Sequence, residues 1–241
     1  ISARTREHVL KLAKEYNYVP YASATAPTTR TLTMGVTMTI GEYAVTGPLA
    51  RYLNLHPDVN VCLRFGNTDR LLEALRAGEM DLALSEGYIR SEEFDTELFR
   101  RERYIPVCAA GHALPAGKQK LKELLGERLI LREKGSGSRK ILERNLAARN
   151  LKISDFIHYA EVENIHTMVS LLVRDCGIAF LYEAAVEQEI RQGLLKEIRL
   201  EDFSMDHEFL FLWNKGSVFS SELKKLCEEW IQLDKDASGG R

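Results

Sequence analysis

The chain has few of the features that mark several large protein classes. Its 241 residues hold four widely separated cysteines, whose spacing suits neither a zinc site nor a disulfide framework. No apolar run is long enough to span a bilayer, and no secretory signal is recognisable. We therefore expect a cytoplasmic protein with no membrane association. The chain begins at Ile1 instead of a methionine, which is typical of a fragment or a processed form.

Catalytic motifs are missing as well. The six histidines do not form an HExxH pattern, which disfavours a zinc hydrolase. Gly135-Ser136-Gly137 does not have the Gly-x-Ser-x-Gly form of a nucleophile elbow, and its serine has no evident base. The acidic pairs Glu92-Glu93 and Glu228-Glu229 are expected on exposed helices, where water solvates their charges. We therefore expect no enzyme, no metal site and no cofactor.

The charge of the chain is small but uneven. A formal net charge of −2 gives no overall electrostatic case for nucleic acid or for an anionic membrane. Residues 1–30, however, hold five basic and two acidic side chains, a charge of +3, which leaves −5 for the remainder. A basic arm on an acidic body indicates a DNA contact at the N-terminal end.

The chain does contain a clear alternation of strands and helices. From Gly66 to Gly87 the pattern predicts a turn, an amphipathic helix with Leu71 and Leu75 on its apolar face, a stop at Gly78 and a covered strand at 81–84. Strands that alternate with helices favour a mostly parallel sheet, whose ligands lie at the carboxyl ends of its strands. The polar residues expected at those ends are Thr37, Thr39, Ser85 and Glu86.

The remaining pattern divides the chain into two lobes. Tyr104–Ala109 is a predicted strand that leaves the first lobe, and Glu208–Trp213 is a strand that returns to it. Two βα lobes joined by two crossings form an α/β clamshell with a cleft between them. The expected division is residues 1–30 for an N-terminal helix and linker, 31–105 with 207–234 for lobe I, 106–206 for lobe II and 235–241 for a disordered tail.

The loop Arg132–Arg139, REKGSGSR, has the composition of an anion site. Gly137 lets the backbone approach a ligand, and the first amides of the following helix lack partners within the helix. The helix dipole and the hydroxyls of Ser136 and Ser138 add further attraction for an anion. A simple helix cap, with Ser138 at the N-cap, is the alternative interpretation.

Two other junctions allow the same pair of interpretations. Thr37 and Thr39 can donate hydrogen bonds to a carboxylate, or can cap a helix that properly begins at 46–48. Asn164 can cap the helix that follows it, while Glu163 and His166 face either the cleft or the solvent.

Several segments together are similar to one family. They are TLTMGVTMTIGEY, HPDVNVCLRFGN, LLEALRAGEMDLALSEG, AAGHAL, LILREKGSGSRKILERNL, CGIAFLYEAAVEQEI and GLLKEIRL. From Thr31 to about Ile231 the chain resembles the effector-binding domain of LysR-type transcriptional regulators. The resemblance implies a fold like type 2 periplasmic binding proteins, with a small effector in the cleft. It also implies an effector site lined by Thr37, Thr39, Ser136, Ser138 and the Asn164 junction, with Tyr182 altering the cleft wall where the family often has proline.

The N-terminal segment ISARTREHVLKLAKEYNYVPYASA is instead similar to the last headpiece helix and hinge of LacI-type repressors. Ala24, Thr25 and Pro27 stand where that family has Ala-Arg and a leucine that wedges into the minor groove. This departure argues against such a wedge. The resemblance implies a DNA-binding headpiece that lies mostly upstream of Ile1.

The sequence therefore predicts the ligand-sensing domain of a bacterial transcriptional regulator that binds a small anionic metabolite. The LysR resemblance implies a homodimer or homotetramer that assembles through the helix 42–55 and the strand 59–64. A solute-binding protein for transport of an organic anion is one alternative, because it can share the clamshell. A cleft enzyme that acts on an organic acid through Ser138 or His166 is the other.

Overall fold

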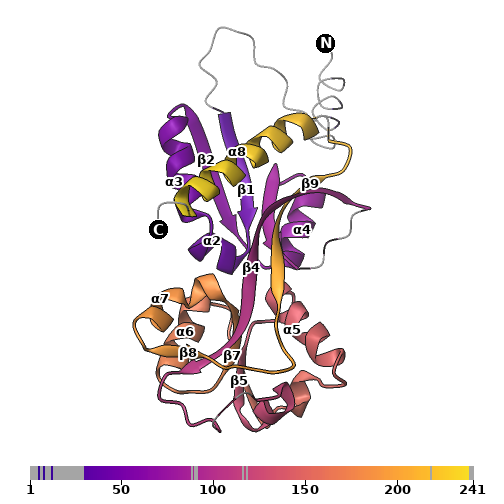
Figure 1. Ribbon diagram of the computed structural model, residues 1–241. Helices are drawn as coiled ribbons and strands as arrows, with labels where there is room; N and C mark the ends of the chain where they lie inside the picture. Colours follow the sequence, from indigo (N-terminus) through magenta and orange to yellow (C-terminus); the bar gives the residue numbers. More distant parts are fainter. Residues whose placement is uncertain are drawn as a thin grey trace.

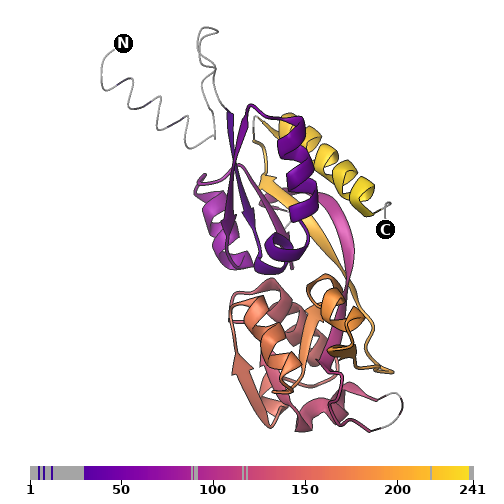
Figure 2. The same cartoon turned by 90° about the vertical axis from the view of Figure 1, so that its left-hand side faces the viewer.

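The structure is a computed structural model, and it describes residues 30–238 except 88, 90, 91, 116, 118 and 218, together with Thr5, His8 and Leu12. The chain forms two α/β lobes stacked end to end, as Figures 1 and 2 show. The expected N-terminal helix and linker lie outside the described residues, apart from those three, each of which is helical. No helix in the described part of the chain is long and apolar enough to cross a membrane.

Lobe I is built on a mixed sheet. Its strands are β1 (Arg30–Val36), β2 (Val59–Phe65), β3 (Leu82–Glu86), β9 (Asp206–Asn214) and the first part of β4 (Phe94–Ala109). They lie in the order β2-β1-β3-β9-β4. The first three are parallel, whereas β9 runs antiparallel to both β3 and β4. The carboxyl ends of β1 and β3 therefore meet at the edge that faces lobe II.

Helices cover both faces of the lobe I sheet (Figure 1). On one face α3 (Thr46–Leu55) packs against α8 (Ser220–Ser238), where the rings of Tyr52 and Trp230 lie 5.4 Å apart. On the other face α4 (Thr68–Arg76) buries Leu71 and Leu75. The predicted amphipathic helix and its stop are confirmed, because α4 ends at Arg76 and Gly78 has a positive φ of 69°.

Lobe II consists of shorter elements. Its strands are the second part of β4, β5 (Arg128–Leu131), β6 (His158–Glu161), β7 (Ala179–Tyr182) and β8 (Leu195–Glu197). Its helices are α5 (Gly137–Ala147), α6 (Ile165–Val173) and α7 (Glu187–Arg191), with 3-10 turns at Leu121–Gly126, Ile153–Asp155 and Glu183–Ala185. Strand β5 pairs with β6 and also bridges to Ile178 just before β7. Lobe II thus places the N-terminal end of α5 toward lobe I.

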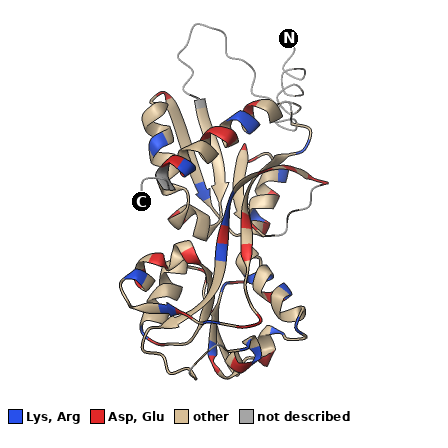
Figure 3. Ribbon diagram, viewed as in Figure 1, with Lys and Arg blue, Asp and Glu red and all other residues tan. Residues whose placement is uncertain are grey.

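The strand β4 joins the two lobes. Burial alternates along its first part, where it borders the lobe I sheet, and becomes continuous from Tyr104 onward, where β7 and β8 pair with it. The sequence predicted only this second part, because the charged first part, Phe94–Arg103, has no continuous apolar run. Figure 3 shows charged residues along both crossing strands, and Arg101 there binds Glu208 at 2.9 Å.

The structure corrects three predictions about the helix at 42–55, the pair Glu92-Glu93 and the C-terminal tail. The helix expected at 42–55 is divided between α2 (Met38–Tyr43) and α3, with a break at 44–45, whereas the alternative start at 46–48 is confirmed because α3 begins at Thr46. Glu92-Glu93 lies in a turn before β4 and not on a helix. The expected tail is helical as far as Ser238. Within it, the carbonyl of Asp236 accepts a hydrogen bond from Arg51 at 3.2 Å. Residues 239–241 lie outside the described part.

Candidate functional site

Most residues of the expected site converge where the lobes meet. Thr37, Thr39 and Ser85 come from lobe I, at the ends of β1 and β3 and the start of α2. Lobe II contributes Ser136, Gly137 and Ser138 at the start of α5, and Tyr182 at the end of β7. All seven are buried. Asn164 differs, because it is exposed and uses its side chain to cap α6, accepting from the amide of Thr167 at 2.9 Å.

The lobe I wall contains a buried carboxylate. Glu86 is the last residue of β3 and is 1% exposed, and its side chain accepts a hydrogen bond from the hydroxyl of Thr37. Burial raises the pKa of Glu86 above that of an ordinary glutamate, while the Thr37 hydrogen bond and the charge of Arg132 act in the opposite direction. The wall therefore presents a strong acceptor that has been removed from water.

Ser85 faces the other side of the same strand. Its hydroxyl lies 3.1 Å from the hydroxyl of Thr68 at the start of α4, and both hydroxyls are 3.0 Å from the carbonyl oxygen of Glu86. Strand alternation explains this separation, because neighbouring residues on β3 point to opposite faces. Ser85 therefore ties α4 to the end of β3, and its side chain does not share the face of Glu86.

The lobe II wall is built from donors. The hydroxyls of Ser136 and Ser138 lie 2.9 Å apart at the N-terminal end of α5, whose first amides have no partners in a preceding turn. Arg132, directly after β5, is 4% exposed and binds Glu133 through Nε at 2.8 Å and Nη2 at 3.1 Å. Its Nη1 is buried and, among the described residues, has no hydrogen-bond partner. A buried guanidinium nitrogen without an acceptor is costly, and an anion would satisfy it.

The guanidinium of Arg132 acts across the boundary between the lobes. Its charge lowers the pKa values of Glu42 and Glu86, both in lobe I, against the larger effect of burial. Beside Glu42, burial and the charges of Glu42 and Glu189 raise the pKa of Tyr43 to about 12. These groups mark one continuous polar region between α2 and the end of β5.

The lobes touch on the other flank of this region. A Cβ atom at Gly137 would lie 2.4 Å from the carbonyl oxygen of Glu86, so only glycine permits this approach of α5 to β3. Close by, Lys140 of α5 forms an ion pair with Asp69 of α4, and the amide of Asp69 lies 3.4 Å from the carbonyl of Gly135. The structure thus holds the two walls together.

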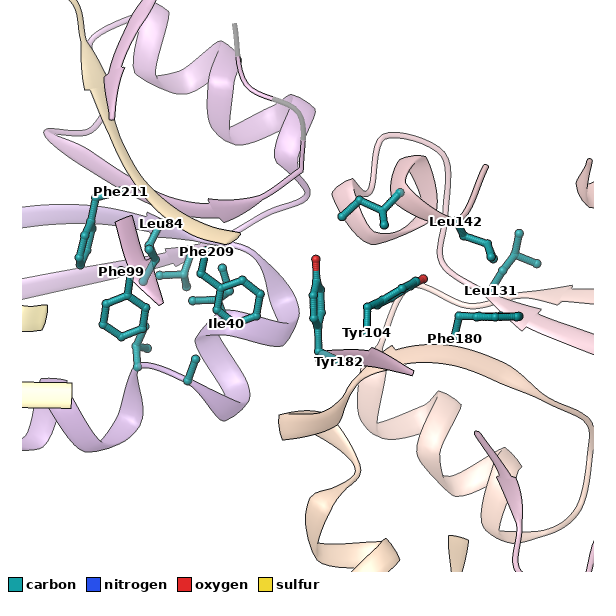
Figure 4. Packing of buried hydrophobic residues seen from close by; sticks show 14 of the residues in the cluster. Ile40, Leu84, Phe99, Tyr104, Leu131, Leu142, Phe180, Tyr182, Phe209 and Phe211 are labelled. Atoms are coloured by element: carbon teal, nitrogen blue, oxygen red, sulfur yellow. The ribbon is translucent and has the colours of Figure 1, made fainter. Parts of the chain in front are cut away.

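Aromatic rings close the base of the region. Figure 4 shows Tyr182 between Phe209 and Ile40 on one side and Tyr104 on the other, and the ring centroids are 4.8 Å from Phe209 and 5.1 Å from Tyr104. The hydroxyl of Tyr104 donates to the carbonyl of Ser138 at 3.1 Å. The pair joins the cores of the two lobes and positions the start of α5.

The capping alternatives are only partly right. For Asn164 the cap is confirmed, and Glu163 and His166 are both exposed. For the Gly-Ser loop the proposed cap is wrong, because α5 begins at Gly137 and Ser136 is the N-cap, with no capping bond from its side chain. Thr37 is likewise an N-cap without a capping bond, since its hydroxyl binds Glu86. The hydroxyls at these two helix starts are thus not used for capping.

Sequence reasoning missed the role of the charged members of the region. Arg132 was visible only as the first residue of the Gly-Ser loop, and Glu86 only as one of the polar residues expected at strand ends. A charged residue directly after a covered strand was the available signal, because that position lies at the ligand-binding edge of a parallel sheet.

A hollow elsewhere in the molecule has a volume of about 190 Å³ and is lined by Arg103, Tyr104, Pro106, Phe203 and Met205, among others. Two of its charged residues bind each other, because Arg103 forms an ion pair with Glu197 at 2.7 Å, and Arg103 also binds Glu183 outside the lining. The region between the lobes is therefore the stronger candidate. In the described ranges no group of three or more His, Cys, Asp or Glu residues could hold a metal ion.

Known proteins resemble the chain in both sequence and fold. Residues 25–232 match the family described as LysR substrate binding domain. The chain is similar to the HTH-type transcriptional regulator CysL of Bacillus subtilis (strain 168), with 24% identity over 182 residues, which cover 75% of this chain and 60% of that protein. The chain therefore spans about 60% of that relative. The family match excludes the first 24 residues, and none of these comparisons supports the LacI-type resemblance.

Two solved structures share the fold. The CcmR regulatory domain of Synechocystis PCC6803, solved in complex with 2-PG, has a TM-score of 0.75 at 17% identity, over 85% of this chain and 97% of that one. A sulfate-bound mutant of the OxyR2 regulatory domain from Vibrio vulnificus has a TM-score of 0.70 at 20% identity, over 88% and 100%. These similarities confirm the expected two-lobed α/β fold.

Proposed function

The chain belongs to the LysR substrate binding domain family, and we propose from this premise that it binds a small anionic metabolite between its lobes. Binding would favour one arrangement of the lobes or subunits over another, and this difference in affinity would modulate DNA binding by the whole regulator. The proposed site comprises the seven converging residues, Thr37, Thr39, Ser85, Ser136, Gly137, Ser138 and Tyr182, with Arg132 and Glu86 added. Asn164 is retained only as the cap of α6.

The observation that carries the proposal is the unsatisfied Nη1 of Arg132. The charge of Arg132 acts on Glu42 and Glu86 of lobe I, and Arg132 precedes α5, whose N-terminal hydroxyls are not used for capping. An anion at this place would receive a charge-assisted hydrogen bond and the favourable end of the α5 dipole. The sulfate-bound structure of a related fold supports an anion in this class of domain, and the complex with 2-PG supports a small bound molecule.

The alternatives are weaker. A solute-binding role in transport is disfavoured, because the family and CysL are associated with transcriptional regulation. The family is one of binding domains, and the enzyme alternative has little geometric support: the Ser138 hydroxyl bonds Ser136, and His166 is exposed on α6.

The wider role of the protein is also a proposal. We infer a cytoplasmic DNA-binding regulator that assembles as a homodimer or homotetramer, with the boundaries between the two lobes expected from the sequence. The basic charge of residues 1–30 supports a connection to a DNA-binding headpiece, of LacI type by resemblance. Size-exclusion chromatography with light scattering would test the assembly.

A ligand screen tests the site itself. Purified chain is heated with organic acids, amino acids, sugars and phosphates, and a ligand of the folded state raises the melting temperature. Arg132→Gln should weaken binding of an anionic hit by about 10- to 100-fold, since it removes a hydrogen bond to a charged group. Ser138→Ala and Thr39→Ala should weaken it less.

Arg128→Gln is the matched control, because Arg128 is the exposed first residue of β5, the strand that Arg132 directly follows. Equal loss in both arginine variants, or stabilisation by neutral ligands alone, would contradict an anion site at Arg132.

A further inference from the structure

The lobe I wall contains the carboxylate of Glu86, to which the proposed anion site assigns no role. The side chain of Glu86 is almost fully buried, and the hydroxyl of Thr37 is the side-chain donor that the structure gives it. Within the described part of the chain, no ion pair joins Glu86 to Arg132, which binds Glu133 instead. A buried carboxylate without a cation is costly, so its presence where the lobes meet points to a functional role.

The charges around the region make the same point. Lobe I contributes two carboxylates, Glu42 and Glu86, and lobe II contributes Arg132 together with Glu133. Glu189 and His166 also act on this region, from α7 and α6. These carboxylates thus outnumber the guanidinium of Arg132. A ligand that carried only negative charge would be attracted by Arg132 and repelled by the opposite wall.

The two incompletely satisfied groups come from different lobes. The unsatisfied donor, Nη1 of Arg132, follows β5, whereas the carboxylate of Glu86 ends β3. A ligand that satisfies both must present an acceptor and a donor, and it would bridge the walls. Such a ligand gains affinity only when the lobes are close, which is the property that a sensor of this architecture needs.

We propose that the effector carries two kinds of group: an anionic group bound by Arg132, and a hydroxyl or ammonium donor received by the carboxylate of Glu86. This inference rests on the proposed anion site and narrows its ligand to hydroxy acids and amino acids. Thr37 acts as a positioning residue that holds the Glu86 carboxylate.

Matched acids test the inference. Two sets are titrated calorimetrically, propionate with lactate and alanine, and glutarate with 2-hydroxyglutarate and glutamate. Within each set the carbon chain is constant and only the donor differs. At least one hydroxyl or ammonium member should bind about tenfold or more tightly than its plain acid, the scale of one hydrogen bond to a charged group.

Glu86→Gln should remove that preference, because it takes away the charge and keeps the size of the side chain. The affinity for the plain acid should stay within about twofold or increase, since a repulsive charge is lost. Glu73→Gln, an exposed change on α4, should leave both affinities unchanged. Circular dichroism of each variant confirms that it is folded.

The outcomes separate the two proposals. Suppose that acids bind and that their affinity falls in Arg132→Gln but is the same with and without a hydroxyl or ammonium group. The anion site then stands, and the role of Glu86 is refuted. If Glu86→Gln weakens plain acids as much as donor-bearing acids, the role of Glu86 is also refuted. If no anion of any set binds the unmodified chain, the anion site fails, and the inference that rests on it fails too.

Discussion

The two walls of the interlobe region differ in chemistry although both are ends of βα units. The lobe I wall offers acceptors, with Glu86 buried at the end of β3 and Glu42 on α2. The lobe II wall offers donors, with Arg132 after β5 and two serine hydroxyls at the start of α5. Glu86 and Arg132 form no ion pair with each other among the described residues, and this is the basis of our proposal that an effector binds between the walls.

The walls also differ in how they are held. Lobe I has a five-stranded sheet with helices on both faces, so Glu86 sits on a covered strand. Lobe II positions Arg132 through a loop, which Arg139 of α5 fixes by donating to the carbonyl of Arg132 at 2.9 Å. The lobe II wall therefore has more freedom to adjust to a ligand than the lobe I wall.

The largest loss of stability should come from removing the aromatic ring of Tyr182, which joins the cores of the two lobes. Tyr182→Ala removes the ring that packs between Phe209 and Tyr104, and it should destabilise the protein by about 3–5 kcal/mol, as expected for a large buried side chain. Tyr182→Phe keeps the ring and should cost much less. Denaturant unfolding of both variants measures the difference. Equal losses would mean that the hydroxyl, and not the packing, joins the lobes.

A smaller loss of stability is expected where the start of α5 approaches the end of β3. Gly137→Ala places a methyl group against the carbonyl of Glu86, and this overpacking should cost about 1–3 kcal/mol or force the walls apart. Gly126→Ala is the control, because no atom lies within 4 Å of its added Cβ. Unfolding curves and acid binding are compared. If Gly137→Ala binds and unfolds like Gly126→Ala, then α5 does not need its close approach to β3.

The stability of the protein should depend on pH through Glu86 in the lobe I wall. The raised pKa of Glu86 means that the folded protein releases this proton at a higher pH than the unfolded chain does. Its stabilising contribution is complete below the ordinary glutamate pKa and is lost as the pH rises through the raised pKa. Glu86→Gln cannot ionise, so its melting temperature should exceed that of the unmodified chain at neutral pH and approach it near about pH 4.

Glu73→Gln again serves as the control, and the other carboxylates with raised pKa values are common to all three proteins. A difference between Glu86→Gln and the unmodified chain that does not change with pH would show that the pKa of Glu86 is the same in the folded and unfolded states, which would contradict a raised pKa.

The smallest effect is expected for the ion pair across the flank. Lys140 and Asp69 are both about half exposed, so Lys140→Ala should change stability by less than about 1 kcal/mol, and high salt should abolish the change. Lys122→Ala, an exposed lysine on the 3-10 turn Leu121–Gly126, gives the baseline. A loss of several kcal/mol that resists salt would instead make this pair the main link between the walls.

Several elements of this fold could be predicted from local pattern alone. The helix α4 and the strand β3 follow directly from the spacing of their apolar residues and from Gly78, because these signals act within a few residues. The charged part of β4 was not predictable in this way. Its conformation depends on pairing with β9, which is distant in the sequence.

The sequence by itself determined the two-lobed α/β class, the convergence of the strand ends and the presence of donors at the Gly-Ser loop. Local periodicity and loop composition encode these features. Only the tertiary structure decided that Arg132 is buried with an unsatisfied nitrogen, that Glu86 is buried opposite it, and that Asn164 merely caps a helix. Burial and the pairing of charges depend on which segments meet in space, and a single sequence does not show those contacts.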